Sequence, residues 1–536
     1  EPHATVAKVH ESGQIEVWAS TQAVVQLVHD IAERFDVHER DIVVHADYVG
    51  GGFGAKAGIT IDAVVAIELA YETRRPVRVV LSREDEIAVG GVRPAQRFTI
   101  RLGATESGEL AALHSEAYAN GGVAVGTITG FLMRLIYPSS RKELRDYDVV
   151  TNSAPGKPLR APGGPPAFFA LEQTVDEIAV RRGESPLDLR RRWDENPGRL
   201  RIYDWLESLD AWKERATGEQ TGRYRVGIGV ASAAWFYFTQ VNSQLEVTLD
   251  QGRLTARTSA QDMGNGTRST IAYGLADALG LDPRAIEVDI GSSGSVVGPM
   301  SAGSRTTASL VPAAEHAAEQ IRDALADHAR EARGIRGKPQ RHGLQHDAGG
   351  FTPWSDLLAD APPITVVGRR RGDDRAFFLP IAVGNLKIGR QSPGAVQMSR
   401  VEVDTWTGRV RVTGAWVGVS VGRIVAPPLA RSQVEGGVVQ GISYALYEDR
   451  RLDPSKGVLL TAGLEDYRLA GIGDVPPVVV HFDEQGFEDV RGGGVGLAEI
   501  CTTPCAASIA NAVANATGKR MRSLPLRPDV VKGVLA

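Results

Sequence analysis

The sequence predicts a mixed α/β fold built of at least two large lobes. Three observations predict it: a length of 536 residues, a hydrophobic content of 43% beside 23% charged residues, and two stretches in which strand-like and helix-like segments alternate. The length suffices for about two to four domains, and the composition is ordinary for a globular protein. We predict the main division near residue 225, before a strand-rich section at 226–230, which gives domains 1–225 and 226–536.

The first alternating stretch covers residues 42–81. Residues 42–46 are strand-like, 50–54 form a glycine loop, 61–72 have the apolar spacing of a helix, and 77–81 are strand-like again. A glycine loop ahead of a helix gathers free backbone N–H groups and the positive end of the helix dipole. We therefore expect this loop to hold an anion.

The second alternating stretch covers residues 255–290. Its strands are expected at 255–259 and 286–290, its helix at 271–279, and its loop at 263–266. One glycine loop is weak evidence for a ligand. Two such loops, with a third at 492–496, indicate a large anionic cofactor that is bound from several directions.

The remaining elements follow from local composition. Helices are expected at 312–333, with a proline in the first turn, and at 429–447. Two strands within 396–418 are expected to pair around a turn at 406–408. The polar stretches 194–224 and 334–363 are predicted to be irregular surface segments.

Charge and cysteine content exclude several classes of protein. The formal net charge is −5 and no apolar run is long enough to span a bilayer, so neither a nucleic acid partner nor a membrane span is expected. The basic clusters 190–192 and 369–371 are expected to be solvated faces or subunit contacts. Cys501 and Cys505 are expected to be small buried packing groups, with a redox or metal role as the alternative.

One carboxylate, Glu499, follows the glycine run at 492–496 and precedes an Ala-rich segment that ends at Gly518. Thr503 suits the N-cap and Pro504 the first turn of a helix in that segment. A lone acid held by a glycine loop just ahead of a helix is well placed to act as a general base. The alternative is a solvated loop glutamate, and the rest of the chain has to decide between them.

Several short motifs of the chain occur in the order that they have in one enzyme family. The motifs lie at 17–22, 50–56, 160–163, 263–266, 301–306 and 433–437, with Glu499 after them. In this order they resemble the molybdenum-cofactor subunit of the xanthine dehydrogenase and aldehyde oxidoreductase family. The resemblance implies two molybdopterin-binding lobes with the cofactor held between them, and an oxidoreductase activity.

The resemblance implies hydroxylation of an electron-poor carbon, with water as the oxygen source and Glu499 as the general base. Arg160 would be a fixed cation that stabilises negative charge, with a structural ion pair as the alternative. Because the pterin carries the molybdenum, no side chain is expected to ligate the metal. Cofactor contacts are expected from Gly51, Gly52, Phe53, Gly54, Arg160, Met263, Gly264, Asn265, Gly266, Ser301, Gly303, Ser304, Thr306 and Gln433.

The substrate pocket is expected to include Phe53, Ala57, Pro162, Trp235 and Phe236. Phe53 and Gly54 would shape its floor and offer a backbone N–H. Because side chains of a strand alternate between its faces, at most two of the four aromatic residues at 235–238 are expected to line it.

Departures from the family pattern bear on the substrate. Ala57 replaces a glutamate that binds the ring in purine-oxidising relatives, and Pro162 replaces their stacking phenylalanine. Both changes favour an aldehyde first and an N-heteroaromatic compound second, with a purine third. Asn265 is one methylene shorter than the usual glutamine, which leaves its direct bond to the cofactor open. A catalytically silent assembly paralogue is the alternative to an enzyme.

The resemblance also implies partners. Two cysteines cannot supply the four ligands of a [2Fe–2S] cluster, and no flavin motif opens a helix, so iron–sulfur and FAD subunits are expected in a hetero-oligomer. Family members carry a further N-terminal lobe, which a separate chain would supply unless the start is truncated. The cytosine dinucleotide form of molybdopterin and a cytoplasmic location are expected, with the periplasm, reached through a partner's export signal, as the alternative.

Overall fold

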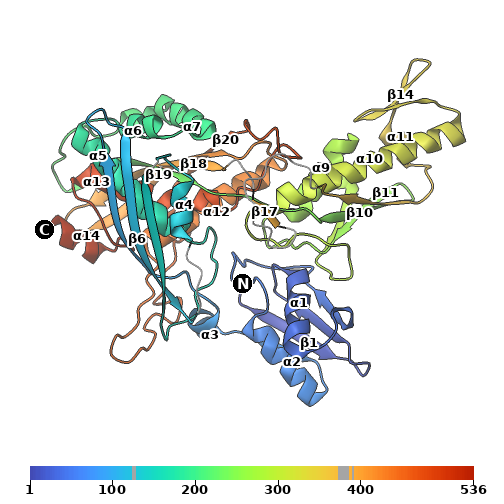
Figure 1. The fold of residues 1–536 in the computed structure, drawn as a ribbon, viewed down its shortest axis with the longest axis horizontal. Helices are drawn as coiled ribbons and strands as arrows, with labels where there is room; N and C mark the ends of the chain where they lie inside the picture. Colours follow the sequence, from blue (N-terminus) through green and yellow to red (C-terminus); the bar gives the residue numbers. More distant parts are fainter. Residues whose placement is uncertain (124–127, 140, 372–385, 389–391) are drawn as a thin grey trace.

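The computed structural model describes residues 1–123, 128–139, 141–371, 386–388 and 392–536. Figure 1 shows three parts: an N-terminal sheet with two helices, a second sheet with two helices from the middle of the chain, and a larger part in which several helices cover another sheet. The mixed α/β prediction is confirmed. Within the described ranges, no helix has the length and apolar character needed to cross a lipid bilayer.

The N-terminal unit is a four-stranded sheet in the order β3-β2-β1-β4. Its strands are β1 (Ala4–Val9), β2 (Ile15–Ala19), β3 (Ile42–His45) and β4 (Val77–Val80). β1 pairs antiparallel with β2 and β4, whereas β2 and β3 are parallel and are joined by α1 (Val24–Phe35). α2 (Ile61–Thr73) leads from β3 to β4. Buried side chains such as Val17, Ile31 and Ile67 form the core between sheet and helices.

The second unit repeats this topology, with the strand order β12-β11-β10-β16. Its strands are β10 (Gln244–Asp250), β11 (Arg253–Thr258), β12 (Ile286–Ile290) and β16 (Ile364–Arg369), and its helices are α9 (Thr267–Leu279) and α10 (Thr306–Arg333). The parallel pair β11 and β12 corresponds to β2 and β3. The sequence predicts that 42–81 and 255–290 are two units of the same kind. In the structure, the segment equivalent to 255–290 is instead β2-α1-β3. The order of strand, helix and strand does not show which edge of a sheet the last strand joins.

Four loops of these two units lead from a strand into a helix. They contain Gln22, the glycines at 51–54, residues 263–266 and residues 301–305. Each unit contributes two of these loops, and the two strands that precede them are parallel. The two loops of each unit therefore leave the same end of their sheet. The two units touch at this end, where His45 pairs with Ser292. The repeated topology therefore gathers four loops in one place.

The third part contains a sheet in the order β20-β19-β18-β8. Its strands are β8 (Tyr224–Ala234), β18 (Gly394–Asp404), β19 (Arg409–Ser420) and β20 (Val478–Asp483), packed by α5 (Gly164–Arg182) and α13 (Cys505–Thr517). A Cβ atom on Gly229 would lie 2.1 Å from the backbone nitrogen of Ala512, so only glycine lets β8 approach α13 this closely. β8 starts beside the predicted division at residue 225, which stays a prediction.

Other elements complete the structure. The sheet β5-β6-β7 consists of β5 (Gln96–Ala104), β6 (Leu110–Gly122) and β7 (Lys142–Val150), and the pair β17-β9 of Leu386–Ile388 and Phe238–Gln240. The remaining helices are α3 (Arg83–Val89), α4 (Thr129–Arg134), α6 (Pro186–Trp193), α7 (Pro197–Ser208), α8 (Asp210–Lys213), α11 (Trp354–Leu358), α12 (Pro427–Leu446) and α14 (Pro528–Leu535).

Both stretches predicted to be irregular contain regular structure. Residues 194–224 include α7 and α8, and 334–363 include α11 and the sheet of β13 (Gly337–Pro339), β14 (Gly343–His346) and β15 (Phe351–Pro353). Asn196 caps α7 by accepting a hydrogen bond from the Arg199 N–H, and Pro197 occupies the first turn. The polar composition of 194–224 hid this helix-start signal.

Helix α10 starts at Thr306, six residues before the predicted start, so Pro312 lies inside it. A proline has no N–H, which leaves the carbonyl four residues earlier without its helical partner. Arg370 donates to that carbonyl, Ala308 O, at 2.8 Å. Arg370 is therefore buried, and the prediction of a solvated basic face is wrong for this residue.

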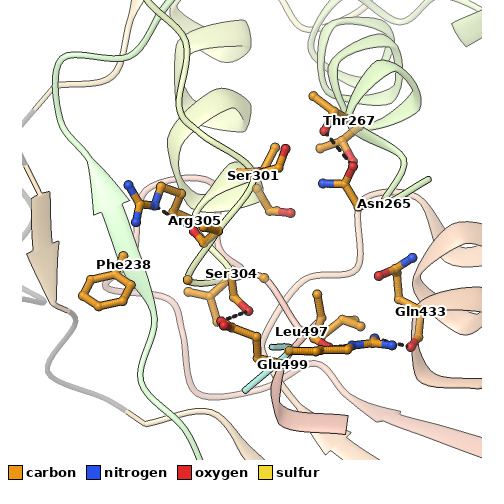
Figure 2. Close-up of a pocket in the computed structure, with 18 of the residues that line it drawn as sticks. Phe238, Asn265, Thr267, Ser301, Ser304, Arg305, Gln433, Leu497 and Glu499 are labelled. Carbon is orange, nitrogen blue, oxygen red and sulfur yellow. Dashed lines mark hydrogen bonds between the residues drawn. The ribbon is translucent and has the colours of Figure 1, made fainter. Parts of the chain in front are cut away.

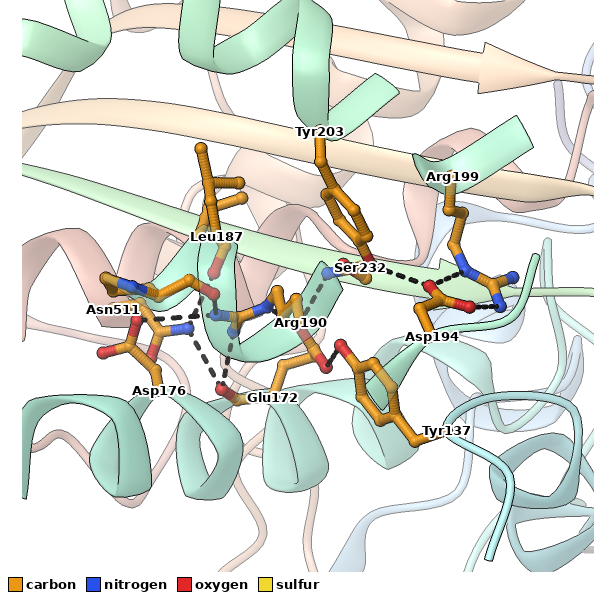
Figure 3. A network of polar contacts seen from close by, with 12 residues as sticks. Tyr137, Glu172, Asp176, Leu187, Arg190, Asp194, Arg199, Tyr203, Ser232 and Asn511 are labelled. Atoms are coloured by element: carbon orange, nitrogen blue, oxygen red, sulfur yellow. Dashed lines mark hydrogen bonds and ion pairs between the residues drawn. The ribbon is translucent and has the colours of Figure 1, made fainter. Parts of the chain in front are cut away.

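In the basic cluster 190–192, Arg191 and Arg192 are partly exposed and form surface ion pairs. Arg190 is fully buried, so the prediction of a solvated face is wrong for this residue (Figure 3). Its Nε donates to Glu172 at 2.8 Å, and Glu172 also accepts from the Tyr137 hydroxyl at 2.7 Å and the Ser232 N–H at 2.6 Å. The glutamate thus ties α5, α6 and β8 together. No spacing rule connects Arg190 to an acid on a neighbouring helix, so the sequence did not reveal the pair.

Candidate active site

A cavity of about 500 Å³ lies where the four loops meet the third part of the structure (Figure 2). The aromatic residues after β8, the start of α12 and the segment 495–499 complete its wall. It brings together fifteen of the predicted site residues: Phe53, Gly54, Arg160, Pro162, Trp235, Phe236, Met263, Gly264, Asn265, Ser301, Gly303, Ser304, Thr306, Gln433 and Glu499. Gly51, Gly52, Ala57 and Gly266 do not line it.

Glu499 lies in the wall of this cavity. Its Oε2 atom accepts a hydrogen bond from the Ser304 hydroxyl at 2.9 Å and one from the Trp235 indole N–H at 3.0 Å. Burial raises the pKa of Glu499, and the two hydrogen bonds and the charges of Arg305 and Arg160 oppose that rise only in part. Among the residues that the structure describes, Glu499 forms no ion pair. It is therefore a carboxyl group that can take up and release a proton.

Backbone geometry brings Glu499 and Ser304 together. A Cβ atom on Gly496 would lie 2.3 Å from the carbonyl oxygen of Ser304. Only glycine at this position therefore allows the backbone before Glu499 to pack directly against the backbone at Ser304. Ser304 itself has φ = 50°, in the left-handed region that is uncommon for non-glycine residues. The predicted helix after Glu499 ends at Gly518 as expected, but it begins at Cys505 after a 3₁₀ turn at Ile500–Thr502, and Pro504 is its N-cap.

Arg160 forms hydrogen bonds with residues next to Glu499 and forms no ion pair with the Glu499 carboxylate itself. Its Nε donates to the carbonyl of Ala498, and its Nη2 donates to the carbonyl of Gln433 at 2.7 Å. Nη1 donates to Gln440 Oε1 at 3.2 Å, and Nη2 also lies 3.2 Å from the buried Sγ of Cys501. No acid among the described residues pairs with it. These contacts make Arg160 a positioning residue for Glu499, and its predicted role in charge stabilisation stays a prediction.

The aromatic run at 235–238 contributes more to the cavity than predicted. Trp235, Phe236 and Phe238 all line it, while Tyr237 packs against Phe487 with ring centroids 6.2 Å apart. The limit of two residues assumed a continuous strand, but β8 ends at Ala234 and β9 begins at Phe238. The side chains between the two strands do not alternate, which removes the limit.

Backbone N–H groups of two predicted loops are already occupied. The Gly54 N–H donates to Gln22 Oε1 at 2.9 Å, and the N–H groups of Gly264, Gly266 and Arg268 donate to the Asp262 carboxylate at 3.0–3.1 Å. The prediction of free donors is therefore wrong for these four N–H groups. Asp262 lies just before the loop and caps α9 in the manner of an anion.

Two other helices begin at the cavity. α10 has no side-chain hydrogen bond at its N-cap, and residues of its first turn line the cavity, so its first backbone N–H groups can attract an anion. α12 offers no such donors, because Pro427 and Pro428 have no N–H and the Leu429 N–H donates to the carbonyl of Ala426 at 3.1 Å. Asn265, Thr267 and Gln433 provide polar side chains on the other side of the Ser304–Glu499 contact (Figure 2). That side of the cavity can hold the polar groups of a cofactor.

The sequence missed several residues that the cavity includes. Gln22 joins two loops, since its Nε2 donates to Ser301 O at 2.8 Å while its Oε1 accepts from Gly54. Phe238 and Arg305 also line the cavity, and they lie inside the sequence motifs 235–238 and 301–306. Thr267 and Thr270 are in the first turn of α9. A search for hydroxyl residues at helix starts next to the glycine loops would have found these two.

Within the described part of the chain, no group of three His, Cys, Asp or Glu side chains is arranged to hold a metal ion. Cys501 and Cys505 are buried thiols, and burial raises the pKa of Cys505 to about 12. They pack as small groups, as expected, because a thiol with this pKa is not the reactive thiolate form at neutral pH.

Comparison with known proteins gives matches along most of the chain. Two family models, each described as a molybdopterin cofactor-binding domain, match residues 1–193 and 202–476. The chain is 29% identical over 560 residues to the aldehyde oxidoreductase molybdenum-binding subunit PaoC of Escherichia coli (strain K12), covering 99% of this chain and 73% of PaoC. It is 26% identical over 568 residues to the putative xanthine dehydrogenase molybdenum-binding subunit XdhA of the same strain, covering 98% and 74%.

Solved structures show the same fold. Quinoline 2-oxidoreductase from Pseudomonas putida 86 superimposes with a TM-score of 0.87 at 22% identity, covering 100% of this chain and 74% of that one. An aldehyde oxidoreductase from Desulfovibrio gigas superimposes with a TM-score of 0.81 at 23% identity, covering 100% and 59%.

Proposed function

Because this chain belongs to the molybdopterin-binding subunits of the xanthine dehydrogenase and aldehyde oxidoreductase family of molybdenum oxidoreductases, we propose that it hydroxylates an aldehyde or an N-heteroaromatic compound with Glu499 as general base. The observation that carries the proposal is the position of Glu499. It lies in the cavity wall between a polar end and an aromatic end, without an ion pair among the described residues.

The residues around the cavity fit molybdopterin. Asn265, Thr267, Ser301 and Gln433 line the polar side of the cavity and would bind its polar groups and its phosphate (Figure 2). When bound, the cofactor supplies the metal centre at which an oxygen atom from water reaches the substrate and two electrons are taken up. No side chain of the described residues has to ligate the metal.

Glu499 would accept the proton that the attacking oxygen loses. Its raised pKa suits this task, since a general base works best when its pKa is near the working pH. Ser304 and Trp235 hold the accepting carboxylate in place, and Arg160 fixes the backbone beside it.

The shape of the aromatic end supports a flat substrate. Phe53, Trp235, Phe236 and Phe238 present apolar rings to the cavity, and Pro162 adds a small apolar surface. An aromatic aldehyde or an N-heteroaromatic ring packs well against such walls. Ala57 is not part of the wall, so its replacement of a purine-binding glutamate gives no argument about purines, and the substrate class rests on the aromatic residues.

We propose that iron–sulfur and FAD subunits accept the electrons in a hetero-oligomer. The similar Escherichia coli proteins are named as molybdenum-binding subunits, which supports such partners. The cytosine dinucleotide form of the cofactor and the cytoplasmic location stay predictions. Acid release of the nucleotide from the purified complex, followed by chromatography, identifies the cofactor form.

The experiment that tests the function uses the complex purified with its partners. We expect stoichiometric molybdenum, and turnover of aldehydes or N-heteroaromatics with an artificial electron acceptor in isotopically labelled water, with the label in the product. Stoichiometric molybdenum without turnover of any aldehyde, heteroaromatic or purine would favour the silent paralogue. Turnover of purines alone would overturn the substrate class.

A further inference from the structure

The aromatic end of the cavity contains one cation, Arg305, that the proposed mechanism does not use. It is the N-cap of α10 and lines the cavity beside Phe238, whose ring centroid lies 5.5 Å from its Cζ atom. Its Nε donates to the carbonyl of Ala302 at 2.7 Å, which fixes the direction of the guanidinium. Burial lowers the pKa of Arg305 to about 10, so the group is still charged at neutral pH.

The two terminal nitrogens of Arg305 have no hydrogen-bond or ion-pair partner among the described residues. Two fully buried arginines of the chain differ in this respect. Arg190 pairs with Glu172, and Arg199 pairs with Asp194 through two hydrogen bonds of 2.6 Å. The charge of Glu499 acts on Arg305 without an ion-pair contact between them. A guanidinium that is partly removed from water with open donors is unfavourable unless a ligand supplies the missing acceptors.

Arg305 also lies at the substrate end of the cavity. In Figure 2, Arg305 and Phe238 stand on one side of the Ser304–Glu499 contact, and Asn265, Thr267 and Gln433 stand on the other side. The polar side is the one with which the proposed function associates the cofactor. A molecule that stacks against Phe238 within reach of Glu499 therefore meets the open nitrogens of Arg305.

We propose that Arg305 binds a carboxylate of the substrate, so that the preferred substrates are aromatic aldehydes or N-heteroaromatics that carry an acid group. A carboxylate matches the planar pair of terminal nitrogens with two parallel hydrogen bonds. The ring of the same molecule packs against Phe238 and Phe236. This inference rests on the proposed function, because the reacting carbon has to lie beside Glu499.

The first test compares matched substrates in the purified complex. The pairs are para- and meta-formylbenzoate with their methyl esters, and nicotinate with methyl nicotinate, in wild type, Arg305→Met and Arg305→Lys. We expect the wild type to prefer the acid of at least one pair by about tenfold or more in kcat/KM. Arg305→Met should lose this preference through KM, and Arg305→Lys should keep part of it.

The ratio of acid to ester within each variant separates charge recognition from a general loss of activity, including any effect on Glu499. An unchanged ratio in Arg305→Met, with the esters turned over, would overturn this inference and leave the proposed function standing. Failure of every substrate in the wild type would overturn the proposed function, and this inference with it.

A second measurement does not depend on turnover. Isothermal titration calorimetry on the complex compares benzoate with benzamide, which have the same ring and differ in charge. We expect benzoate to bind more tightly by about tenfold or more in the wild type and to lose that advantage in Arg305→Met. Equal affinities of the two compounds in the wild type would contradict the assigned role of Arg305.

Discussion

Two glutamates in the interior of this protein, Glu172 and Glu499, have opposite surroundings. Glu172 accepts hydrogen bonds from a buried arginine, a tyrosine hydroxyl and a backbone N–H (Figure 3). Glu499 accepts two hydrogen bonds from neutral donors, Ser304 and Trp235, at the wall of a cavity (Figure 2). The negative charge of Glu172 is thus neutralised by an ion pair with Arg190, whereas Glu499 forms no ion pair among the described residues.

The difference separates a structural acid from the proposed general base. The ion pair between Glu172 and Arg190 joins two helices, and breaking it would leave a buried charge poorly compensated. Glu499 has no such partner among the described residues, and burial raises its pKa, which favours uptake of a proton. The charge of the hydrogen-bond donors therefore distinguishes the two residues.

The largest effect is expected from Glu499→Gln. Glutamine keeps the size of the side chain but cannot accept the proton, and a general base contributes about 10²–10⁴-fold in rate. We therefore expect turnover with an artificial acceptor to fall by about that factor at unchanged molybdenum content. Retention of most of the wild-type rate would show that the base is another group.

The same variant should not lose stability. The pKa of Glu499 is higher in the folded protein than in the unfolded chain, so its contribution to stability is present at low pH and is lost as the pH rises through the folded pKa. At neutral pH, glutamine removes this unfavourable ionisation. The temperature of thermal unfolding should stay level or rise slightly, as differential scanning calorimetry can check.

Glu172→Gln is expected to give the opposite pattern. It removes the nearer counter-charge of the buried Arg190 guanidinium and leaves only Asp176 at 3.9 Å, and breaking a buried ion pair costs about 3–5 kcal/mol. Thermal unfolding should occur at a clearly lower temperature, while the activity per bound molybdenum stays near that of the wild type.

The control for this loss is Glu68→Gln, which breaks a surface pair with Arg34 at 3.4 Å. Both side chains are about half exposed, and such pairs contribute about 0–1 kcal/mol. If Glu172→Gln were no less stable than Glu68→Gln, the comparison between the two buried glutamates would lose its physical basis.

The sequence predicts the position of the proposed base better than that of the structural glutamate. Glu499 follows a glycine run, and Gly496 is needed for contact with Ser304, so a local pattern carries its position. The partner of Glu172 is Arg190, which stands in a run of three arginines on another helix, and no local pattern marks it as buried. Long-range contacts of this kind depend on the packing of whole elements.

The same reason explains other differences between prediction and structure. The start of α10 before Pro312 depends on Arg370, which lies 62 residues after the carbonyl that it binds. The third aromatic residue of the cavity depends on a break between β8 and β9 that composition does not show. Where local rules and tertiary contacts agree, as in β3, α2 and β4, the predicted elements are found.

The smallest and most specific change is expected from Ser304→Ala. The Ser304 hydroxyl donates to Glu499 and holds its pKa lower than burial alone would set it. Removing this donor raises the pKa of Glu499, so a higher pH is needed to form the unprotonated base. The acid limb of the profile of kcat against pH should therefore move to higher pH, with reduced turnover at neutral pH and recovery at alkaline pH.

The control is Ser399→Ala, in which the lost hydroxyl partner is Ser508 at 2.7 Å and not Glu499. A uniform loss at all pH values in Ser304→Ala, or the same shift in Ser399→Ala, would mean that the hydroxyl only supports the loop and does not tune the base.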